Sequence, residues 1–307
     1  MQGIFSWLGL PIFPRCPVRI WMVLAAALIA ALAVVLIIMF KRKKKGRKIG
    51  HAADAVTQIP RRRPVLELAN LQGIGSRSEQ QDSFRISRLD RYEEDGLLAV
   101  LCDGMGGMAE GGLIASQTAS ELMDAFPWED DENMPQWIRT HSEKVYRRFR
   151  GHGGTTLVAA LLRGDELSFW CVGDSDLFLL REGKLIALNT RQEYKNELVL
   201  RALSGAVRLE DAFADPQAGA LSEYIGKEDA ACDYTRIPFR LKREDTLLLC
   251  SDGVSDTLTL KQIREALTLP PQECCARMEE EISAARRPQQ DNYTAIIIKY
   301  NGKGEER

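Results

Sequence analysis

Apolar runs that end at an aspartate recur along this 307-residue chain, and they limit what it can fold into. The clearest run ends at Asp103, which Gly104 follows, and another ends just before Asp252. Asp174 follows a third run, and Asp291 opens a fourth. Apolar strands that stop or start at an aspartate bring carboxylates to one edge of a sheet. Hard divalent cations prefer oxygen ligands, so this pattern predicts a metal-dependent hydrolase.

The composition excludes several other classes of protein. A chain of 307 residues that is 45% hydrophobic can bury one sizeable core, with length left over for another segment. A net charge of −2 does not favour nucleic acid or another polyanion as a partner. The seven cysteines show no C-x-x-C spacing, so we expect reduced, buried thiols rather than a zinc site or a redox pair.

Residues 20–40 are 21 consecutive positions without a charged or strongly polar side chain. As a helix this run would extend roughly 30 Å, the thickness of the hydrocarbon core of a bilayer. The segment 41–48 carries seven cations in eight positions, which outnumber Arg15 and Arg19 before the run. The positive-inside rule therefore predicts a transmembrane helix at 20–40, a short extracytoplasmic N-terminus at 1–19 and a cytoplasmic remainder. A cleaved signal peptide is disfavoured, because the run is long and its cations follow it.

The remainder of the chain divides into three parts. Residues 41–64 are polar and basic, include Pro60 and Pro64, and lack apolar periodicity, which is typical of a juxtamembrane linker. Residues 65–300 are expected to form one folded domain, and residues 301–307 a flexible tail.

Strands and helices alternate in groups along the predicted domain. Apolar patterns predict strands at 96–102, 156–162, 167–172, 176–180, 185–188, 246–250 and 294–300. Helical periodicity predicts helices at 113–126, 135–149, 260–267 and 272–285. Short turns between 156 and 188 predict one continuous meander. The expected fold class is α+β, a four-layer α/β/β/α sandwich of two antiparallel sheets flanked by helices. Weak patterning at 189–243 predicts an irregular flap.

Short polar and glycine-rich motifs follow one another in order through the domain. They are Arg77-Ser78-Glu79-Gln80-Gln81-Asp82-Ser83, Asp103-Gly104-Met105-Gly106-Gly107, Gly153-Gly154-Thr155-Thr156, Gly173-Asp174-Ser175, Ala220-Leu221-Ser222-Glu223-Tyr224-Ile225-Gly226, Leu249-Cys250-Ser251-Asp252-Gly253 and Asp291-Asn292-Tyr293-Thr294. This series resembles the metal-dependent protein phosphatase family, the type 2C Ser/Thr phosphatases, in its bacterial form. The resemblance covers about residues 71–300. One Asp-Gly pair would be weak evidence, whereas the ordered set is specific.

The resemblance implies a metal centre. Members of that family hold two Mn²⁺ or Mg²⁺ ions at one end of a β-sandwich, where the ions share a bridging water that attacks the phosphoryl group. By resemblance, Asp103 would bridge both ions and the Gly104 carbonyl would bind one of them. Asp252 and Asp291 would complete the first site. Asp174 matches a position that helps to hold a third, weaker ion in bacterial members.

The resemblance also implies two catalytic residues that do not bind the bridged pair of ions. Asp82 would orient metal-bound water, and Arg77 would grip the substrate phosphate, which its forked guanidinium suits. Asp103 counts as catalytic as well, because it would position the nucleophile. His152 is expected to be a solvated loop residue rather than a catalytic acid.

Three positions depart from the family pattern. Gln81 stands where a Glu is frequent, which removes a charge next to Asp82. Asp176 stands where the family usually has Arg, which reverses the local charge. Met105 replaces the His of animal members, as in bacterial relatives, so leaving-group protonation must come from water or another residue.

The sequence therefore predicts a membrane-anchored, cytoplasmic protein Ser/Thr phosphatase that acts on phosphoproteins made by a Ser/Thr kinase. The alternative is a catalytically silent pseudophosphatase that serves as a phosphoprotein-binding or scaffold module, which Gln81, Asp176 and the atypical flap motivate. A binding module has no need to keep the carboxylates of Asp103, Asp252 and Asp291, which argues against it. Regulation of anti-sigma-type partners is compatible with the first interpretation.

Overall fold

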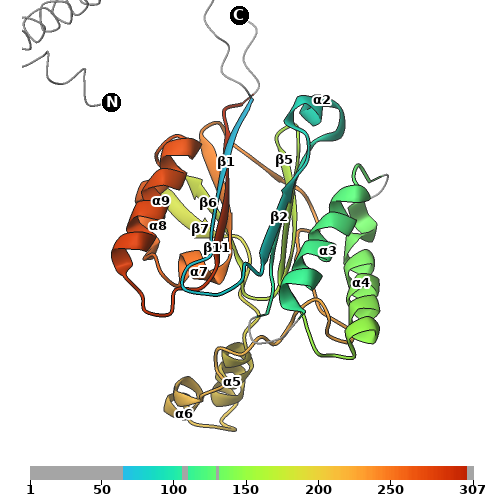
Figure 1. Cartoon of the computed structure of the whole chain (residues 1–307), viewed down its shortest axis with the longest axis vertical. Helices are drawn as coiled ribbons and strands as arrows, with labels where there is room; N and C mark the ends of the chain where they lie inside the picture. The colour runs from blue at the N-terminus through green and yellow to red at the C-terminus, as the bar shows by residue number, and fades with distance from the viewer. Residues whose placement is uncertain (1–64, 106–109, 129–130, 303–307) are drawn as a thin grey trace, which may run out of the picture. The chain divides into compact units, whose positions relative to one another are not determined.

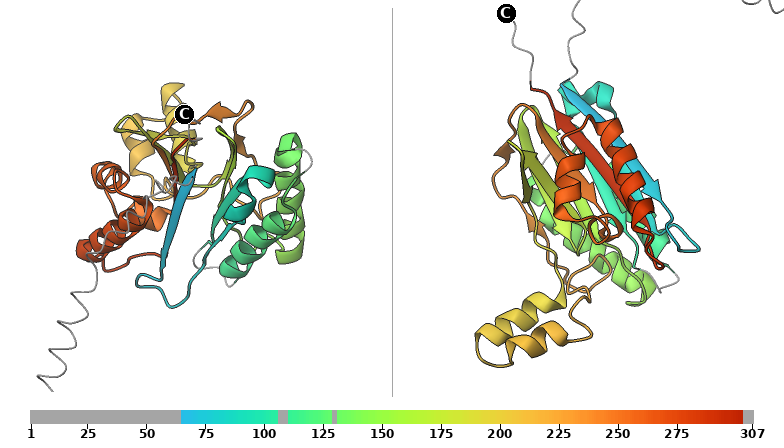
Figure 2. Two further views of the ribbon diagram at one scale, coloured as in Figure 1. Left: turned by 90° about the horizontal axis from the view of Figure 1, so that it is seen from above. Right: turned by 90° about the vertical axis from the view of Figure 1, so that its left-hand side faces the viewer.

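Two antiparallel sheets stacked face to face, with helices on both outer sides, make up the part of the chain that the computed structural model describes (Figure 1). The described residues are 65–105, 110–128 and 131–302. Viewed from above in Figure 2, the layers run helix, sheet, sheet, helix. This confirms the predicted α+β class and its two helix-flanked antiparallel sheets.

The first sheet has the strand order β1-β11-β10-β6-β7, with antiparallel pairing at every step. Its strands are β1 (Leu66–Gly73), β11 (Tyr293–Tyr300), β10 (Asp245–Cys250), β6 (Asp176–Arg181) and β7 (Lys184–Ala187). The second sheet has the order β2-β3-β4-β5-β8, and β9 also pairs with β5. Its strands are β2 (Asp82–Ile86), β3 (Leu97–Asp103), β4 (Leu157–Arg163), β5 (Glu166–Val172), β8 (Asp233–Tyr234) and β9 (Phe239–Arg240).

Each sheet has its own helix pair. The second sheet is covered by α3 (Gly111–Asp124) and α4 (Met134–Phe149), and the first by α8 (Leu260–Ala266) and α9 (Pro271–Ala285) (Figure 1). A capping box formed by Thr259 and Gln262 starts α8. Four shorter elements belong to the sandwich: α2 (Tyr92–Asp95), α7 (Asp252–Ser255) and the 3₁₀ turns η1 (Leu89–Arg91) and η2 (Asp131–Asn133).

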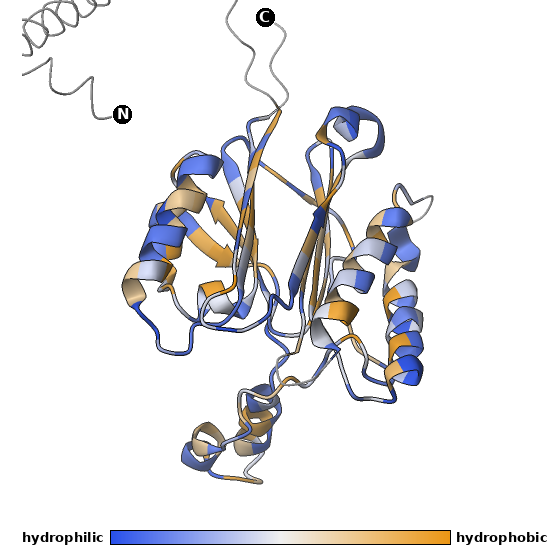
Figure 3. Cartoon of the chain, in the orientation of Figure 1, coloured by the Kyte–Doolittle hydropathy of each residue, from blue (hydrophilic) through white to orange (hydrophobic). Residues whose placement is uncertain are grey.

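Three apolar layers hold the sandwich together. One lies between the sheets and includes Leu101, Val158 and Ile296, and the other two lie between each sheet and its helices. The central strands are apolar at nearly every position, because both of their faces are covered. In Figure 3 orange stretches run through the strands of both sheets, whereas the covering helices carry blue and orange segments in turn.

The prediction of one continuous meander from 156 to 188 is wrong at the turn between β5 and β6. β4 and β5 pair in the second sheet, whereas β6 and β7 pair in the first. The segment at Asp174 is therefore a crossing between sheets and not a hairpin turn. Gly173, with φ +102°, makes that bend, and β6 then pairs with β10. The apolar pattern of each strand was sufficient to predict the strand but not its partner.

From the region 189–243 a flap with two helices, α5 (Tyr194–Leu203) and α6 (Leu209–Ala214), projects from one end of the sandwich, whereas β8 and β9 of the same region join the second sheet (Figures 1 and 2). Its remaining chain is largely irregular, as predicted. The flap exposes Leu200, Leu203 and Phe213. Four strands were not predicted: β1, β2, which begins at Asp82, and the two-residue strands β8 and β9.

No helix in the described ranges is both long and apolar enough to cross a membrane. The predicted transmembrane helix at 20–40, the N-terminus at 1–19, the linker at 41–64 and nearly all of the tail at 301–307 lie outside those ranges.

Candidate active site

Asp103, the last residue of β3, has its backbone fixed by two threonines that directly precede β4. Its N–H donates to Thr156 Oγ1 (3.0 Å). Its carbonyl oxygen accepts from the Thr156 N–H and from Thr155 Oγ1, both at 2.8 Å. Both threonines are buried. The sequence predicted a strand from residue 156 and gave neither threonine a role at the site, yet together they hold the backbone of Asp103 at the end of the sheet.

Gly104 lies where the backbone of two elements meets. Its N–H donates to the Gln81 carbonyl (3.1 Å), and a Cβ at this position would come within 2.5 Å of the Gly111 backbone at the start of α3. Only glycine fits such a close approach. The Asp-Gly pair thus sets the turn that leads from β3 toward α3.

Asp82, which begins β2, pairs in register with Asp103 across the sheet. Its Oδ2 accepts from the hydroxyls of Ser251 (2.8 Å) and Thr294 (2.7 Å), whereas its buried Oδ1 has no hydrogen-bond partner. Burial raises the pKa of Asp82 to about 6, although the hydrogen bonds from the two hydroxyls act to lower it. The charge of Asp252 adds to the rise. A buried carboxylate oxygen without a donor is costly unless a cation compensates it.

Asp252 and Asp291 approach the same end from the first sheet. Asp252 is the first residue of α7, directly after β10, and its Oδ1 is buried without a partner. Asp291 precedes β11, which pairs antiparallel with β10, so that Cys250 lies opposite Ala295. The side chain of Asn292 holds the neighbouring loop by accepting from the Gln81 N–H (2.8 Å) and donating to the Ile74 carbonyl (2.8 Å). The end of β10 and the start of β11 lie side by side, so Asp252 and Asp291 lie at the same end of the first sheet.

Asp174 lies at the crossing between the sheets and is partly buried. Burial, followed by the charge of Asp252, raises its pKa to about 7. The next acid along the chain, Asp176, does not join this cluster. Arg191 binds it with Nη2 to Oδ2 at 2.7 Å and also reaches Asp256 (2.8 Å). The charge reversal at Asp176 is thus neutralised by an arginine at the root of the flap.

Arg77 and Asp291, which were predicted for different roles, form an ion pair of 2.6 Å between Nη2 and Oδ2. Both side chains are partly exposed, at 44% and 39%. The predicted phosphate-binding arginine is therefore at the same site as a predicted metal ligand, on its solvent side.

The carboxylates interact as one group. Burial, and then the charges of Asp82 and Asp252, raise the pKa of Asp103 well above its usual value, although its side chain keeps some exposed surface. In the described residues no three acidic, histidine or cysteine side chains are close enough together to hold one ion as they stand. The charges of these carboxylates still act on one another, because Coulomb interactions extend beyond the distances at which side chains share one ion.

The residue types fit a divalent hard cation. All the candidate donors are oxygens, and Asp82 and Asp252 each have a buried carboxylate oxygen without a partner. The structure brings six predicted residues to one end of the sandwich: Asp82, Asp103, Asp174, Asp252, Asp291 and Arg77, with Gly104 beside Asp103. His152 is exposed in its loop, as predicted.

Sequence reasoning missed five supporting residues at this end: Thr155, Thr156, Ser251, Thr294 and Asn292. Each is polar and buried within or beside an apolar strand. A polar residue within or beside an apolar run indicates a buried hydrogen bond, because buried polar groups need partners. This feature of the sequence could have identified the five residues.

A two-sheet sandwich with carboxylates gathered at one end is an architecture suited to metal-dependent hydrolysis. A family model described as "Protein phosphatase 2C" matches residues 73–287. Because that match covers more than half of the chain, the chain belongs to the protein phosphatase 2C family. Its enzyme class is protein-serine/threonine phosphatase, the class that its relatives' names share.

Two relatives illustrate the similarity in sequence. The serine/threonine phosphatase stp of Listeria monocytogenes is 28% identical over 186 residues, which cover 55% of this chain and 71% of that protein. The serine/threonine protein phosphatase PstP of Mycobacterium tuberculosis is 29% identical over 214 residues, which cover 65% of this chain and 40% of that protein.

Solved structures are similar over the same domain. A serine/threonine phosphatase of S. agalactiae matches with a TM-score of 0.64 and 27% identity, covering 76% of this chain and 98% of that one. The catalytic domain of PstP in complex with two manganese ions matches with a TM-score of 0.60 and 26% identity, covering 76% and 98%.

Proposed function

We propose that this chain is a membrane-anchored protein Ser/Thr phosphatase whose catalytic domain lies in the cytoplasm and uses two divalent metal ions. One observation carries the catalytic part: five aspartates gather at one end of the sandwich, and two of them have a buried oxygen without a partner. Like charges in one buried site repel and raise each other's pKa unless cations are present.

Each residue of the cluster has a role in this proposal. The Asp103 carboxylate and the Gly104 carbonyl would hold the two ions, and Asp252 and Asp291 would complete the first of these sites. Asp174 would help to hold a third ion. Mn²⁺ or Mg²⁺ bound there would supply a bridging water as nucleophile and neutralise charge on the phosphoryl oxygens.

Two further side chains would act on water and substrate. Asp82 already accepts two hydroxyl hydrogen bonds at Oδ2, which leaves Oδ1 to orient a water. Arg77 would exchange its contact with Asp291 for the phosphate of a phosphoserine or phosphothreonine side chain, which its fork can bind through two hydrogen bonds.

The test is Mn²⁺-dependent hydrolysis of a phosphothreonine peptide by the full-length chain in mild detergent. We expect Asp252→Asn to lower kcat/KM by at least about a hundredfold, because metal ions supply several kcal/mol of transition-state stabilisation. Asp124→Asn, at an exposed position in α3, is the matched control and should retain activity. A folded wild-type chain without turnover in Mn²⁺ or Mg²⁺ would instead favour the phosphoprotein-binding module.

The anchor is a separate proposal and rests on the apolar run at 20–40 and the cations that follow it. The full chain should stay with bacterial membranes through an alkaline carbonate wash, and a chain that lacks residues 1–40 should be released. Release of the full chain by the wash would reject the transmembrane helix.

A further inference from the structure

Strand β7 ends the first sheet, and one of its edges is open. Glu182 and Gly183 both have positive φ, so the β6–β7 turn is a tight two-residue hairpin closed by Arg181 and Lys184. In the resulting ladder two kinds of residue alternate along β7. The backbone N–H and C=O groups of one kind bond to β6, and those of the other kind point away from β6. The Leu188 N–H bonds to the Leu177 carbonyl (2.8 Å), which fixes the register.

This register turns the N–H and C=O groups of Leu185 and Ala187 toward the open edge. Neither residue has a backbone partner on that side among residues 65–105, 110–128 and 131–302. An edge of this kind is a template on which an extended segment of another chain can add as a strand.

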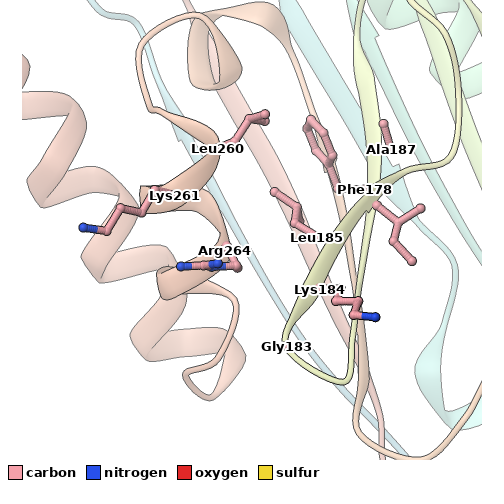
Figure 4. A pocket seen from close by; sticks show the side chains of 9 residues that line it. Phe178, Gly183, Lys184, Leu185, Ala187, Leu260, Lys261 and Arg264 are labelled. Carbon is pink, nitrogen blue, oxygen red and sulfur yellow. The ribbon is translucent and has the colours of Figure 1, made fainter.

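A groove of about 760 Å³ lies between this edge and α8 (Figure 4). Its floor is apolar and includes Phe178 and Leu185. Two large apolar side chains at its rim are unusually exposed, Ile186 at 42% and Leu260 at 63%. The groove shares no lining residue with the carboxylate site.

The charged side chains that line the groove are all cations: Lys184, Lys261 and Arg264. Lys261 approaches Glu265 on its own helix at 3.9 Å, whereas Lys184 and Arg264 make no ion pair within the described residues. The nearby Glu182 is already paired with Lys242. The groove therefore has unbalanced positive charge beside apolar surface and free backbone groups.

We propose that β7 and α8 form a docking surface for an extended, acidic segment of a partner protein, which adds to the β7 edge as a strand. Side chains of an added strand alternate between its two faces. Acidic residues would then face Lys261 and Arg264, and apolar residues would lie beside Ile186.

Charge disfavours two other occupants. The basic segment 41–48 of this chain has seven cations and would be repelled by the groove. A second copy paired edge to edge would bring the same three cations of both copies together.

Binding of a fluorescent peptide of alternating Glu and Val to the full-length chain tests the proposal by anisotropy. A peptide with Lys in place of Glu is the control for charge. We expect binding of the acidic peptide only, and about tenfold weaker binding in the double variant Lys261→Glu/Arg264→Glu, since both reversed charges repel the acidic side chains. Arg150→Glu, at an exposed position beyond α4, should bind as the wild type does.

A second variant tests the strand geometry. Ala187→Pro removes an outward N–H but leaves the bonds to β6, so it should weaken peptide binding without unfolding the chain. Hydrolysis of a short phosphopeptide should not change in any of these variants. Equal binding of both peptides, or no effect of the charge reversal, would overturn the proposal. A dimer that Ala187→Pro dissociates would overturn it in favour of a second copy.

Discussion

Arg77 Nη2 lies 2.6 Å from Asp291 Oδ2, so the candidate phosphate-binding group and a candidate metal ligand neutralise each other. An ion pair that is this exposed is weak in water. It can be exchanged at low cost when a divalent cation binds the carboxylate and a phosphate binds the guanidinium.

The first prediction concerns Arg77. Arg77→Ala should raise KM for a phosphopeptide about tenfold or more, because one charge-assisted contact to the phosphate is lost. Mn²⁺ should bind at least as tightly as in the wild type, because Asp291 is released from its ion pair. Titration of Mn²⁺ by calorimetry and steady-state kinetics measure the two effects. Weaker Mn²⁺ binding together with an unchanged KM would contradict the assignment of Arg77.

The second prediction concerns pH. The pKa of Asp82 is raised to about 6 and that of Asp174 to about 7, so the folded, metal-free chain holds protons that the unfolded chain releases. Stability from these groups is complete below the unfolded pKa, near pH 4, and is lost as pH rises through about 6 to 7. We expect the Tm without metal to fall between pH 5 and 8.

Added Mn²⁺ should reverse this trend, because the ions bind deprotonated carboxylates. The increase in Tm on adding Mn²⁺ should therefore be larger at pH 8 than at pH 5, as measured by differential scanning fluorimetry. Asp174→Asn should reduce the pH dependence of the metal-free chain. A Tm increase that is the same at both pH values would argue against titrating carboxylates at the metal site.

The third prediction concerns Thr156, whose hydroxyl accepts the Asp103 N–H and is hydrogen-bonded to Ser175 (2.7 Å). Thr156→Val keeps the shape of the side chain but leaves a buried N–H without a partner, which costs about 1–3 kcal/mol. Urea unfolding measures that loss. Activity at limiting Mn²⁺ should also fall, because the Asp103 backbone is less well held. Thr156→Ser keeps the hydroxyl and should retain most of the activity.

The fourth prediction concerns Asp176 and Arg191. Their side chains are only 9% and 23% exposed, and the guanidinium also donates to Ser255 (2.7 Å). Asp176→Asn and Arg191→Gln should each destabilise the fold, and the double variant should lose less than the sum, with a coupling energy of about 1–3 kcal/mol. Equilibrium unfolding of the four proteins gives the coupling. Additive effects would show that the pair does not compensate the charge at Asp176.

Much of the fold was predictable because its signals are local. Strand β10 and strand β3 are continuous apolar runs, and a run covered on both faces looks the same in any sandwich. Strand β2, in contrast, mixes polar and apolar side chains over only five residues, so its pattern is weak. The pairing of β6 with β10 was missed because strand partners depend on contacts between distant segments, which a local pattern does not encode.

The sequence by itself determined the family, and it predicted which residues would carry the chemistry, because aspartates that end apolar runs occur in a specific order along the chain. The tertiary structure alone decided how those residues are held. Thr156, Ser251 and Thr294 support aspartates far away in the chain, and Arg191 neutralises Asp176 from the root of the flap. The contacts of Ser251 and Thr294 with Asp82 join the two sheets and form only when the sheets close on each other, whereas Thr156 holds Asp103 within the second sheet. In both cases burial requires each polar group to find a partner from a distant part of the chain.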